Sequence, residues 1–242
     1  MPHIFHVAPE QNRYYAWFEA LHTRIDLLLL GALSESDFQT AEYAIRAELA
    51  DVEKMGNRFD PDSELSRAVE AATACPVSIS KELFSLLSRC LQANRETGGL
   101  FDITVNSPDS YPGLINAVEL TASPDNSGGS LYIQGVSLPL ILDLSGILKG
   151  YALERLRTLL STLGITDALI NLGNSSILSL GHNPSDIPSG HCLTTSGSAT
   201  SDRRHIRNPL TGEFITGQHE VSVTTSDAID GEILATITFL RS

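Results

Sequence analysis

Hydrophobic and polar positions alternate along residues 14–30, and the period then becomes helical over residues 36–55. The alternation predicts one or two long β-strands that end at Gly31. In the second segment, apolar side chains recur every three or four residues over about five turns, which is typical of an amphipathic helix. They are Phe38, Ala41, Ile45, Leu49, Val52 and Met55. A capping-box pattern at Ser36 predicts where this helix begins.

The rest of the chain mixes helices and strands without regular alternation. Local patterns predict a short helix that begins at Pro61, with Asp62, Ser63 and Glu64 in its first turn. Helical periods also predict an amphipathic helix over residues 80–96 and a closing helix over residues 230–240. Strands are predicted over residues 115–121, 131–136, 167–172, 176–180, 192–195 and 221–225. Gly173 and Asn174 predict a hairpin turn between residues 172 and 176. This order predicts an α+β fold: one domain over residues 1–242, mainly antiparallel sheets with helices packed on one side.

Residues 138–163 predict a buried strand that runs into a helix through a turn of small residues. The apolar run 138–142 is expected to pair with residues 131–136 as a hairpin, and Gly164 to stop the helix. Free backbone N–H groups at the helix start, with Lys149 beside them, would attract a phosphate or another anion. The turn matches neither the P-loop nor the Gly-x-Gly-x-x-Gly pattern, so a purely structural turn is the alternative.

Composition and charge limit the function classes. The chain of 242 residues is 42% hydrophobic and 19% charged, as in ordinary globular proteins. Its formal net charge of -13 argues against a nucleic-acid binder, which needs a basic face. Three widely spaced cysteines, Cys75, Cys90 and Cys192, predict buried thiols in a reducing compartment and no disulfide framework. The sequence shows no transmembrane segment or leader, so a cytoplasmic location is expected, or a cell-envelope lipoprotein if a leader was trimmed.

Several side chains are candidates for chemistry. Glu232 and Thr236 lie one helical turn apart, as two hard oxygen donors that could share magnesium with phosphates. The alternative is a solvated Glu and a Thr that bonds to its own helix. Asp102 could position a ligand or cap a turn, and His205 could carry a proton, contact a phosphate or be structural. No Gly-x-Ser-x-Gly elbow precedes a helix, so a hydrolase triad is unsupported.

Seven short blocks stand in order along the chain: residues 59–67 (FDPDSELSR), 101–105 (FDITV), 143–152 (DLSGILKGYA), 171–173 (NLG), 195–197 (TSG), 205–212 (HIRNPLTG) and 234–236 (LAT). Together they resemble the ApbE-type FAD:protein FMN transferase family, once described as thiamine-biosynthesis lipoproteins. The resemblance implies an ApbE-like (T-fold-like) domain that cleaves FAD and transfers FMN, with Mg²⁺, to a Ser or Thr of a target flavoprotein. Some relatives instead hydrolyse FAD to FMN and AMP.

The resemblance also implies roles for individual residues. His205 and Asp102 would be catalytic, and the metal ligands would be the Leu148 carbonyl, Glu232 and Thr236. The implied cofactor-binding residues are Ser63, Glu64, Asp102, Thr104, Asp143, Lys149, Gly173, Asn174, Ser196, Gly197 and His205.

The chain departs from the family pattern at several positions. Leu21 and His22 replace Met-Gly before Thr23, Val69 replaces an Asn, Asn174 replaces a Gly, and Glu232 replaces an Asp. The segment between residues 181 and 192 is also shortened. A degenerate member that only binds flavin nucleotide, or only a protein partner, is therefore the alternative to an active transferase.

Overall fold

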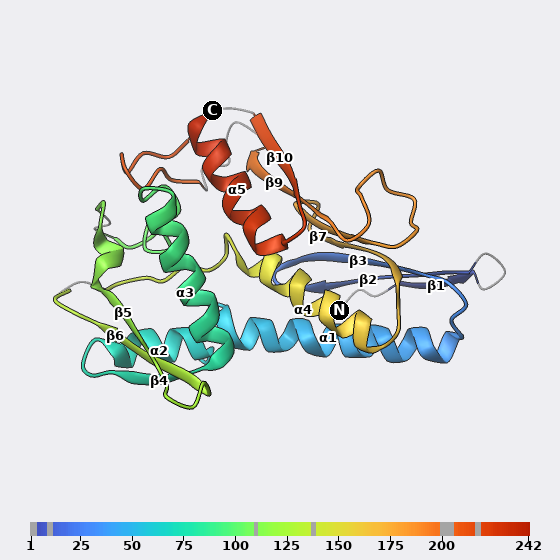
Figure 1. Cartoon of the computed structure of the whole chain (residues 1–242), viewed down its shortest axis with the longest axis horizontal. Helices are drawn as coiled ribbons and strands as arrows, with labels where there is room; N and C mark the ends of the chain where they lie inside the picture. Colours follow the sequence, from blue (N-terminus) through green and yellow to red (C-terminus); the bar gives the residue numbers. More distant parts are fainter. Residues whose placement is uncertain (1–3, 9–11, 109–110, 137–138, 199–205, 216–218) are drawn as a thin grey trace. The chain divides into compact units, whose positions relative to one another are not determined.

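The computed structural model describes residues 4–8, 12–108, 111–136, 139–198, 206–215 and 219–242 (Figure 1). The chain forms two compact units. Unit 1 comprises Met1–Val52, Ile147–Ser196 and Glu220–Ala235, and unit 2 comprises Glu53–Gly146, Gly197–His219 and Thr236–Ser242. A single domain over residues 1–242 stays a prediction. No helix within the described residues is both long and apolar enough to cross a membrane.

A seven-stranded sheet of order β1-β2-β3-β7-β8-β9-β10 forms the body of unit 1. Its strands are β1 (Ile4–Ala8), β2 (Arg13–Ala20), β3 (Thr23–Leu30), β7 (Asp167–Leu172), β8 (Ser176–Leu180), β9 (Cys192–Ser198) and β10 (His219–Thr225). The pairings from β1 to β9 are antiparallel. The strands predicted over residues 14–30 and the hairpin at Gly173 and Asn174 are therefore confirmed.

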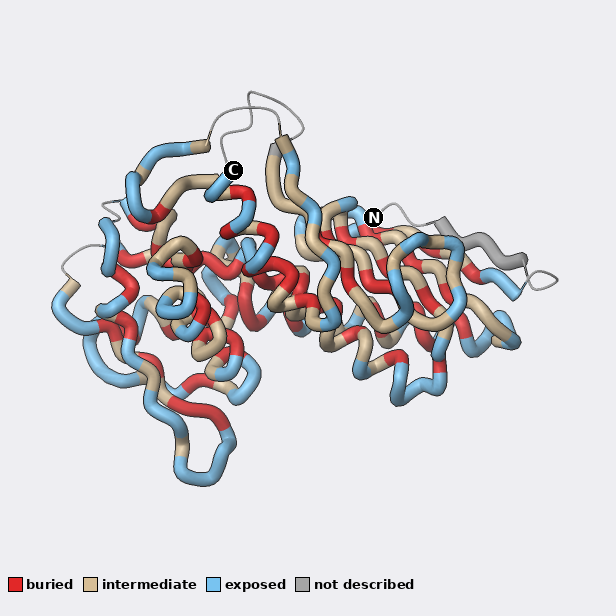
Figure 2. Tube along the Cα trace, turned by 45° about the horizontal axis from the view of Figure 1, so that its top comes forward, coloured by how far each residue is buried: buried red, intermediate tan, exposed pale blue. Residues whose placement is uncertain are grey.

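One face of this sheet is buried over β2, β3 and β7, where alternate residues along each strand are buried (Figure 2). Directly paired residues share a face of the sheet, and one such row crosses five strands. It consists of Phe18, Ile25, Leu172, Ser176 and Thr194, each no more than 1% exposed. The row is apolar from β2 to β7 and carries hydroxyls on β8 and β9. Polar chemistry is thus buried at one end of an otherwise apolar face.

Helix α1 (Glu35–Gly56) packs on this face: the Phe38 ring lies 5.3 Å from that of Tyr14. All six predicted apolar positions of α1 are buried, which confirms the helix. Its cap lies elsewhere than predicted. Asp37 N–H donates to Ser34 Oγ at 3.1 Å, and Ser34 N–H donates to Asp37 Oδ2 at 3.0 Å. The reciprocal pair therefore begins at Ser34, two residues before the predicted box at Ser36.

Two more helices belong largely to unit 1. Helix α4 (Leu148–Thr162) lies beside α1, where Arg155 Nε is 2.6 Å from Glu48 Oε1. It ends as predicted, because Gly164 adopts a φ of 70° and Ile165 N–H donates to Leu160 O at 2.9 Å. Helix α5 (Ala228–Arg241) is the predicted closing helix and begins two residues early.

Unit 2 contains helices α2 (Glu64–Ala72) and α3 (Lys81–Glu96), the 3₁₀ helix η2 (Leu114–Ala117) and a small sheet. The sheet has order β4-β6-β5, formed by β4 (Val77–Ser80), β6 (Gly128–Ile133) and β5 (Val118–Ala122), and its pairings are antiparallel. Ser80 caps α3, which confirms that helix. The strand predicted over residues 115–121 is η2 followed by β5.

The three cysteines were predicted to be buried. Cys90 and Cys192 are buried, but Cys75 is exposed, so the prediction of burial is wrong for Cys75.

The predicted hairpin of residues 131–136 with residues 138–142 is wrong. β6 pairs with β4 and β5 instead, and residues 139–144 form an extended segment outside both sheets. Isolated hydrogen bonds hold this segment in place: Ile141 N–H donates to Ser107 Oγ at 3.0 Å, and Asp143 N–H donates to Ile103 O at 2.7 Å. Leu140, Leu142 and Leu144 are buried. Burial therefore explains the apolar run without a strand.

Candidate functional site

The start of α4 has no side-chain cap of its own. Ile147 occupies the N-cap position without a side-chain hydrogen bond, and the first N–H bonded within the turn is that of Tyr151. The N–H groups before it need partners outside the helix. Glu232 of α5 lies against this turn: the Gly150 N–H lowers the pKa of Glu232, and a Cβ on Gly150 would lie 2.7 Å from Glu232 Cγ. A negative side chain at this positive end of the helix dipole is favourable.

Glu232 is a buried carboxyl group held by donors from several elements. Glu232 is 7% exposed, and the hydroxyl of Ser176 on β8 donates to its Oε1 at 2.6 Å. Burial raises the pKa of Glu232 to about 6, although the charge of Lys149 and the hydrogen bonds from Ser176 and Gly150 act in the opposite direction. The carboxylate is therefore a hard oxygen donor with a strong need for positive charge nearby.

Lys149 lies in the first turn of α4 and is half-buried. Its ammonium group donates to Ser175 Oγ, next to Ser176 in the turn that precedes β8. The predicted anion-binding lysine is thus beside Glu232 in unit 1. A helix start and a lysine together suit a phosphate.

Close approach of backbone shapes this site at two glycines. A Cβ on Gly150 would lie 2.5 Å from Ala228 O and 2.7 Å from Glu232 Cγ, and a Cβ on Gly231 would lie 2.7 Å from Thr194 Oγ1. Gly150 therefore requires glycine, because the clash is with backbone, whereas a side chain at Gly231 would displace the Thr194 hydroxyl. Within the described part of the chain, the buried Thr194 Oγ1 has no hydrogen-bond partner. Sequence reasoning missed Ser176, Thr194 and Gly231, which lie outside the family blocks.

The Gly173 and Asn174 turn lies in the same unit. Both residues have positive φ, 65° and 60°, and Asn171 bonds Asn174 through both its side-chain oxygen and nitrogen at 2.8 Å. A Cβ on Gly173 would lie 2.2 Å from Thr23 Oγ1. Asn174 is thus held against β7. Ser196 and Gly197 lie on β9, and Gly197 has a φ of 143°.

In unit 2, Asp143 is the centre of a polar cluster. Arg58 Nε lies 2.8 Å from its Oδ2, Asn106 Nδ2 donates to the same oxygen at 2.7 Å, and Ser145 N–H donates to Oδ1 at 2.9 Å. Asp143 is 8% exposed, and both oxygens of its carboxylate already have partners. It therefore orders the segment before α4, whatever else it binds.

Asp102 is engaged within its own turn. Its Oδ1 accepts the N–H of Thr104 at 2.7 Å and the Thr104 hydroxyl at 2.6 Å. Burial raises the pKa of Asp102, and the two bonds from Thr104 partly offset the effect. Asp102 also lines a small hollow of about 270 Å³ together with Arg95 and Leu210. The structure thus shows the turn-capping role that the sequence left as an alternative.

The 205–212 block meets the 101–105 block through Arg207. Its guanidinium donates to Gly212 O at 2.7 Å and to Val105 O at 3.1 Å. His205 lies outside the described residues. Thr236 follows Glu232 by one turn on α5 and is half-buried.

The 59–67 block braces two helices of unit 2. Ser63 Oγ accepts the N–H of Ser66 at 3.1 Å and so caps α2. Glu64 accepts the N–H of Ser80 at 2.6 Å and its hydroxyl at 2.8 Å, one on each carboxylate oxygen. Both residues have structural partners, and their role in cofactor binding stays a prediction.

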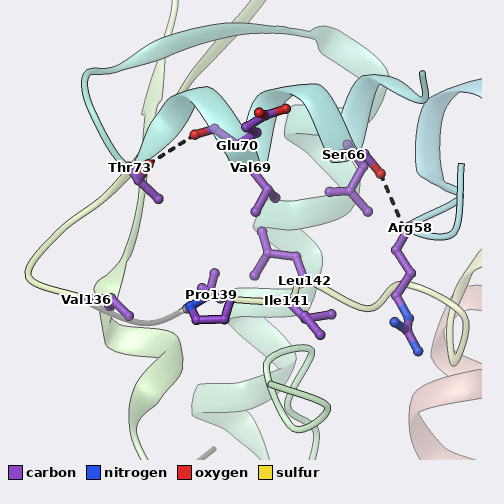
Figure 3. A pocket seen from close by; sticks show the side chains of 11 residues that line it. Arg58, Ser66, Val69, Glu70, Thr73, Val136, Pro139, Ile141 and Leu142 are labelled. Carbon is purple, nitrogen blue, oxygen red and sulfur yellow. Dashed lines mark hydrogen bonds between the residues drawn. The ribbon is translucent and has the colours of Figure 1, made fainter. Parts of the chain in front are cut away.

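A hollow of about 590 Å³ lies in unit 2 between α2 and a wall formed by Val136 and residues 139–142 (Figure 3). Val69 points from α2 toward Ile141 and Leu142, and Arg58 stands at one end. The floor is apolar and the rim carries Ser66 and Thr73. The sequence pointed to this wall at two places: Ser66 in the 59–67 block, and Val69, where the family pattern has Asn. Such a mixture of apolar walls and few polar groups is typical of small-molecule sites.

The described residues contain no group of three or more His, Cys, Asp or Glu side chains that could hold a metal. Mg²⁺, however, is usually bound by one or two carboxylates together with waters and substrate phosphates. Glu232 provides one such carboxylate, Thr236 provides a hydroxyl one turn later on α5, and Leu148 provides a backbone carbonyl on α4. These residues fit Mg²⁺ shared with a phosphate ligand and do not fit a site made by protein side chains alone.

Comparisons with known proteins agree on one family. A family model described as the ApbE family matches residues 21–242. The FAD:protein FMN transferase of Klebsiella pneumoniae (strain 342) is 25% identical over 239 residues, 79% of this chain and 68% of that protein. The enzyme of the same name from Vibrio cholerae is 26% identical over 153 residues, 57% of this chain and 46% of that protein.

Solved structures show the same fold. The structure of flavin transferase ApbE from Vibrio cholerae has a TM-score of 0.76 at 21% identity and covers 94% of this chain and 86% of that one. The Pseudomonas stutzeri flavinyl transferase ApbE has a TM-score of 0.74 at 17% identity and covers 96% and 86%. The α+β fold with antiparallel sheets is therefore confirmed.

Proposed function

The chain belongs to the ApbE family, and from this premise we propose that it is a transferase that moves FMN from FAD to a Ser or Thr of a target flavoprotein. Curated relatives carry the name FAD:protein FMN transferase, which supports flavin transfer as the reaction. The observation that carries the proposal is Lys149 at the start of α4, where the N-cap residue Ile147 supplies no side-chain bond, beside the buried carboxylate of Glu232.

This arrangement suits phosphoryl transfer. The acceptor hydroxyl would attack the phosphorus on the FMN side, a new P–O bond would form, and the P–O bond of the pyrophosphate would break to release AMP. Negative charge collects on the phosphate oxygens during the step. Lys149 and the N–H groups of the first turn of α4 would stabilise this charge, because they are held in place before the reaction begins. The proton of the hydroxyl would pass to Asp102 or His205, the two groups that the resemblance assigns.

The metal belongs to the proposal as well. Glu232 and the Leu148 carbonyl would hold Mg²⁺, with Thr236 as the third ligand that the resemblance implies. When bound, Mg²⁺ supplies charge stabilisation to the phosphates. Glu232 in turn orients the start of α4 through Gly150, so the carboxylate that would bind the cation also holds the helix that carries Lys149.

The test is turnover by the purified chain. With FAD, Mg²⁺ and a flavoprotein acceptor, we expect AMP release by chromatography and a mass increase of one FMN on the acceptor. AMP release without any acceptor would indicate FAD hydrolysis. The absence of both products would overturn the proposal. Lys149→Met is expected to lower turnover by about 100-fold, as is typical of a lost charge contact in the transition state.

A second candidate is a flavin-nucleotide-binding protein without turnover. Val69 supports it, because an apolar side chain there removes a polar group from the wall of the 590 Å³ hollow. Calorimetric binding of FAD that is independent of Mg²⁺, with no AMP formed, would favour this function. Complete absence of flavin binding would leave only a protein-interaction role.

A further inference from the structure

We propose that Glu154 and Arg157 of α4 are positioning residues that set where α5 begins and thereby hold Glu232 against the start of α4. The inference rests on the proposed function, because its consequence is the placement of Lys149 and Glu232. Neither Glu154 nor Arg157 is among the residues to which the family resemblance assigns a role.

The first observation is that Glu154 caps α5. Its Oε1 accepts the N–H of Ala228, the first residue of α5, at 2.8 Å. The first N–H groups of a helix have no partner within it, and a carboxylate there also complements the helix dipole. The start of α5 thus has two caps: Glu154 from α4, and Asp227, whose Oδ1 accepts the N–H of Asp230 at 2.9 Å.

The second observation is that the capping is reciprocal. Glu232 of α5 lies against Gly150 in the first turn of α4: the Gly150 N–H lowers the pKa of Glu232, and a Cβ on Gly150 would lie 2.7 Å from Glu232 Cγ. On each helix the capping glutamate follows the capped residue by four positions, Gly150 to Glu154 and Ala228 to Glu232, so the two share one helix face. The missing Cβ of Gly150 lets the two capped residues approach, since a Cβ would lie 2.5 Å from Ala228 O. Each helix therefore fixes the register of the other.

Arg157 secures this exchange. Its Nε lies 3.0 Å from Glu154 Oε2 and its Nη2 lies 3.1 Å from Oε1, so the guanidinium binds both carboxylate oxygens. The same side chain donates to Ser226 O at 3.2 Å, just before α5, and to Gly190 O at 2.9 Å, just before β9. Bidentate pairing fixes direction as well as distance. Arg157 thus ties Glu154 to the segment that leads into α5.

The first turn of α5 links the Glu154 and Arg157 contacts to the proposed chemistry, because Glu232 follows Ala228 by one turn. If the first turn of α5 moves, Glu232 no longer lines up with both Gly150 N–H and Ser176 Oγ, and Lys149 loses its neighbouring carboxylate. A displacement of about 1 Å at a reacting centre can lower a rate by about 100-fold. We therefore expect the clamp to affect turnover more than FAD affinity.

A double-mutant cycle tests the coupling. Arg157→Met in the full chain is expected to lower kcat for AMP release by at least about tenfold, with KM changed less than about threefold. In a Glu232→Gln background the same change is expected to cost less than about twofold, because Arg157 acts through Glu232. Arg155→Met is the matched control: Arg155 lies on the same helix but pairs with Glu48 of α1. Additive effects of Arg157→Met and Glu232→Gln would overturn the inference.

Hydrogen exchange separates this inference from the proposed function. NMR exchange of the Gly150 and Ala228 amides needs no substrate, and Arg157→Met is expected to speed both by at least about tenfold while Arg155→Met leaves both unchanged. Unchanged exchange in Arg157→Met would overturn the clamp even if the enzyme is active. Absence of turnover in the unmodified chain would overturn the proposed function alone. If Arg157→Met does not fold, Arg157→Lys retains the charge but loses the bidentate contact, and the same exchange criterion applies.

Discussion

The hydroxyl of Ser176 donates a 2.6 Å hydrogen bond to Oε1 of Glu232, and both side chains are buried between the sheet and α5 of unit 1. The row of paired residues that is apolar from Phe18 to Leu172 becomes polar at Ser176, where this carboxylate lies above it. The sheet therefore supplies a donor for a charge that the hydrophobic core could not otherwise hold.

The buried Glu232 should make stability depend on pH. Burial raises its pKa from 4.5 to about 6, so the folded protein binds more protons than the unfolded chain between these values. The contribution of Glu232 to stability is then largest below pH 4.5 and is lost as pH rises through 6, a change of about 2 kcal/mol. Urea unfolding in metal-free buffer should show this slope in the wild type and lose it in Glu232→Gln. An identical pH slope in both proteins would contradict the assignment.

Gly150 should not tolerate a side chain. Gly150→Ala places a Cβ at 2.5 Å from Ala228 O and 2.7 Å from Glu232 Cγ, so α4 and α5 must separate. We expect a loss of about 3 kcal/mol in the free energy of unfolding, as is typical of overpacking against backbone. Gly146→Ala is the control in the same sequence block, because its Cβ meets nothing within 4 Å. Equal unfolding free energies for the two variants would be evidence against the close helix approach.

The sequence predicted local features of this fold better than its long-range contacts. The periods of α1 and α3 and the turn at Gly173 are set by neighbouring residues, and all three were confirmed. The strand predicted over residues 138–142 was wrong, because an apolar run indicates burial and does not distinguish a strand from an extended segment. The bonds from Ser176 to Glu232 and from Ala228 to Glu154 join residues 56 and 74 positions apart. A hydrophobic pattern shows which face is buried but does not identify such partners. The spacing of Glu232 and Thr236 marked Glu232 as a candidate, and the family resemblance gave it a role as a metal ligand.

The turn between β2 and β3 should become more stable with glycine at His22. Leu21 and His22 have φ values of 51° and 55°, a backbone conformation that residues with a Cβ adopt at a cost. His22→Gly removes that strain, and we expect a gain of about 0.5–1 kcal/mol in thermal or urea unfolding. Glu19→Gly, at an exposed β2 position without positive φ, should instead lose about 0.5–1 kcal/mol. A loss of stability in His22→Gly as large as in Glu19→Gly would show that the turn is not strained.

The 590 Å³ hollow of unit 2 offers a gain-of-function test. Val69 points into it at the position where the family pattern has Asn, so Val69→Asn should restore a polar contact if the hollow holds part of a flavin nucleotide. An added hydrogen bond of about 1 kcal/mol corresponds to roughly fivefold tighter FAD binding by calorimetry. Without ligand the same change should slightly lower stability, because the amide would then stand against apolar walls. Val136→Asn, on the opposite wall, is the control and should leave FAD affinity unchanged. Equal affinities for Val69→Asn, Val136→Asn and the wild type would place the flavin nucleotide outside this hollow.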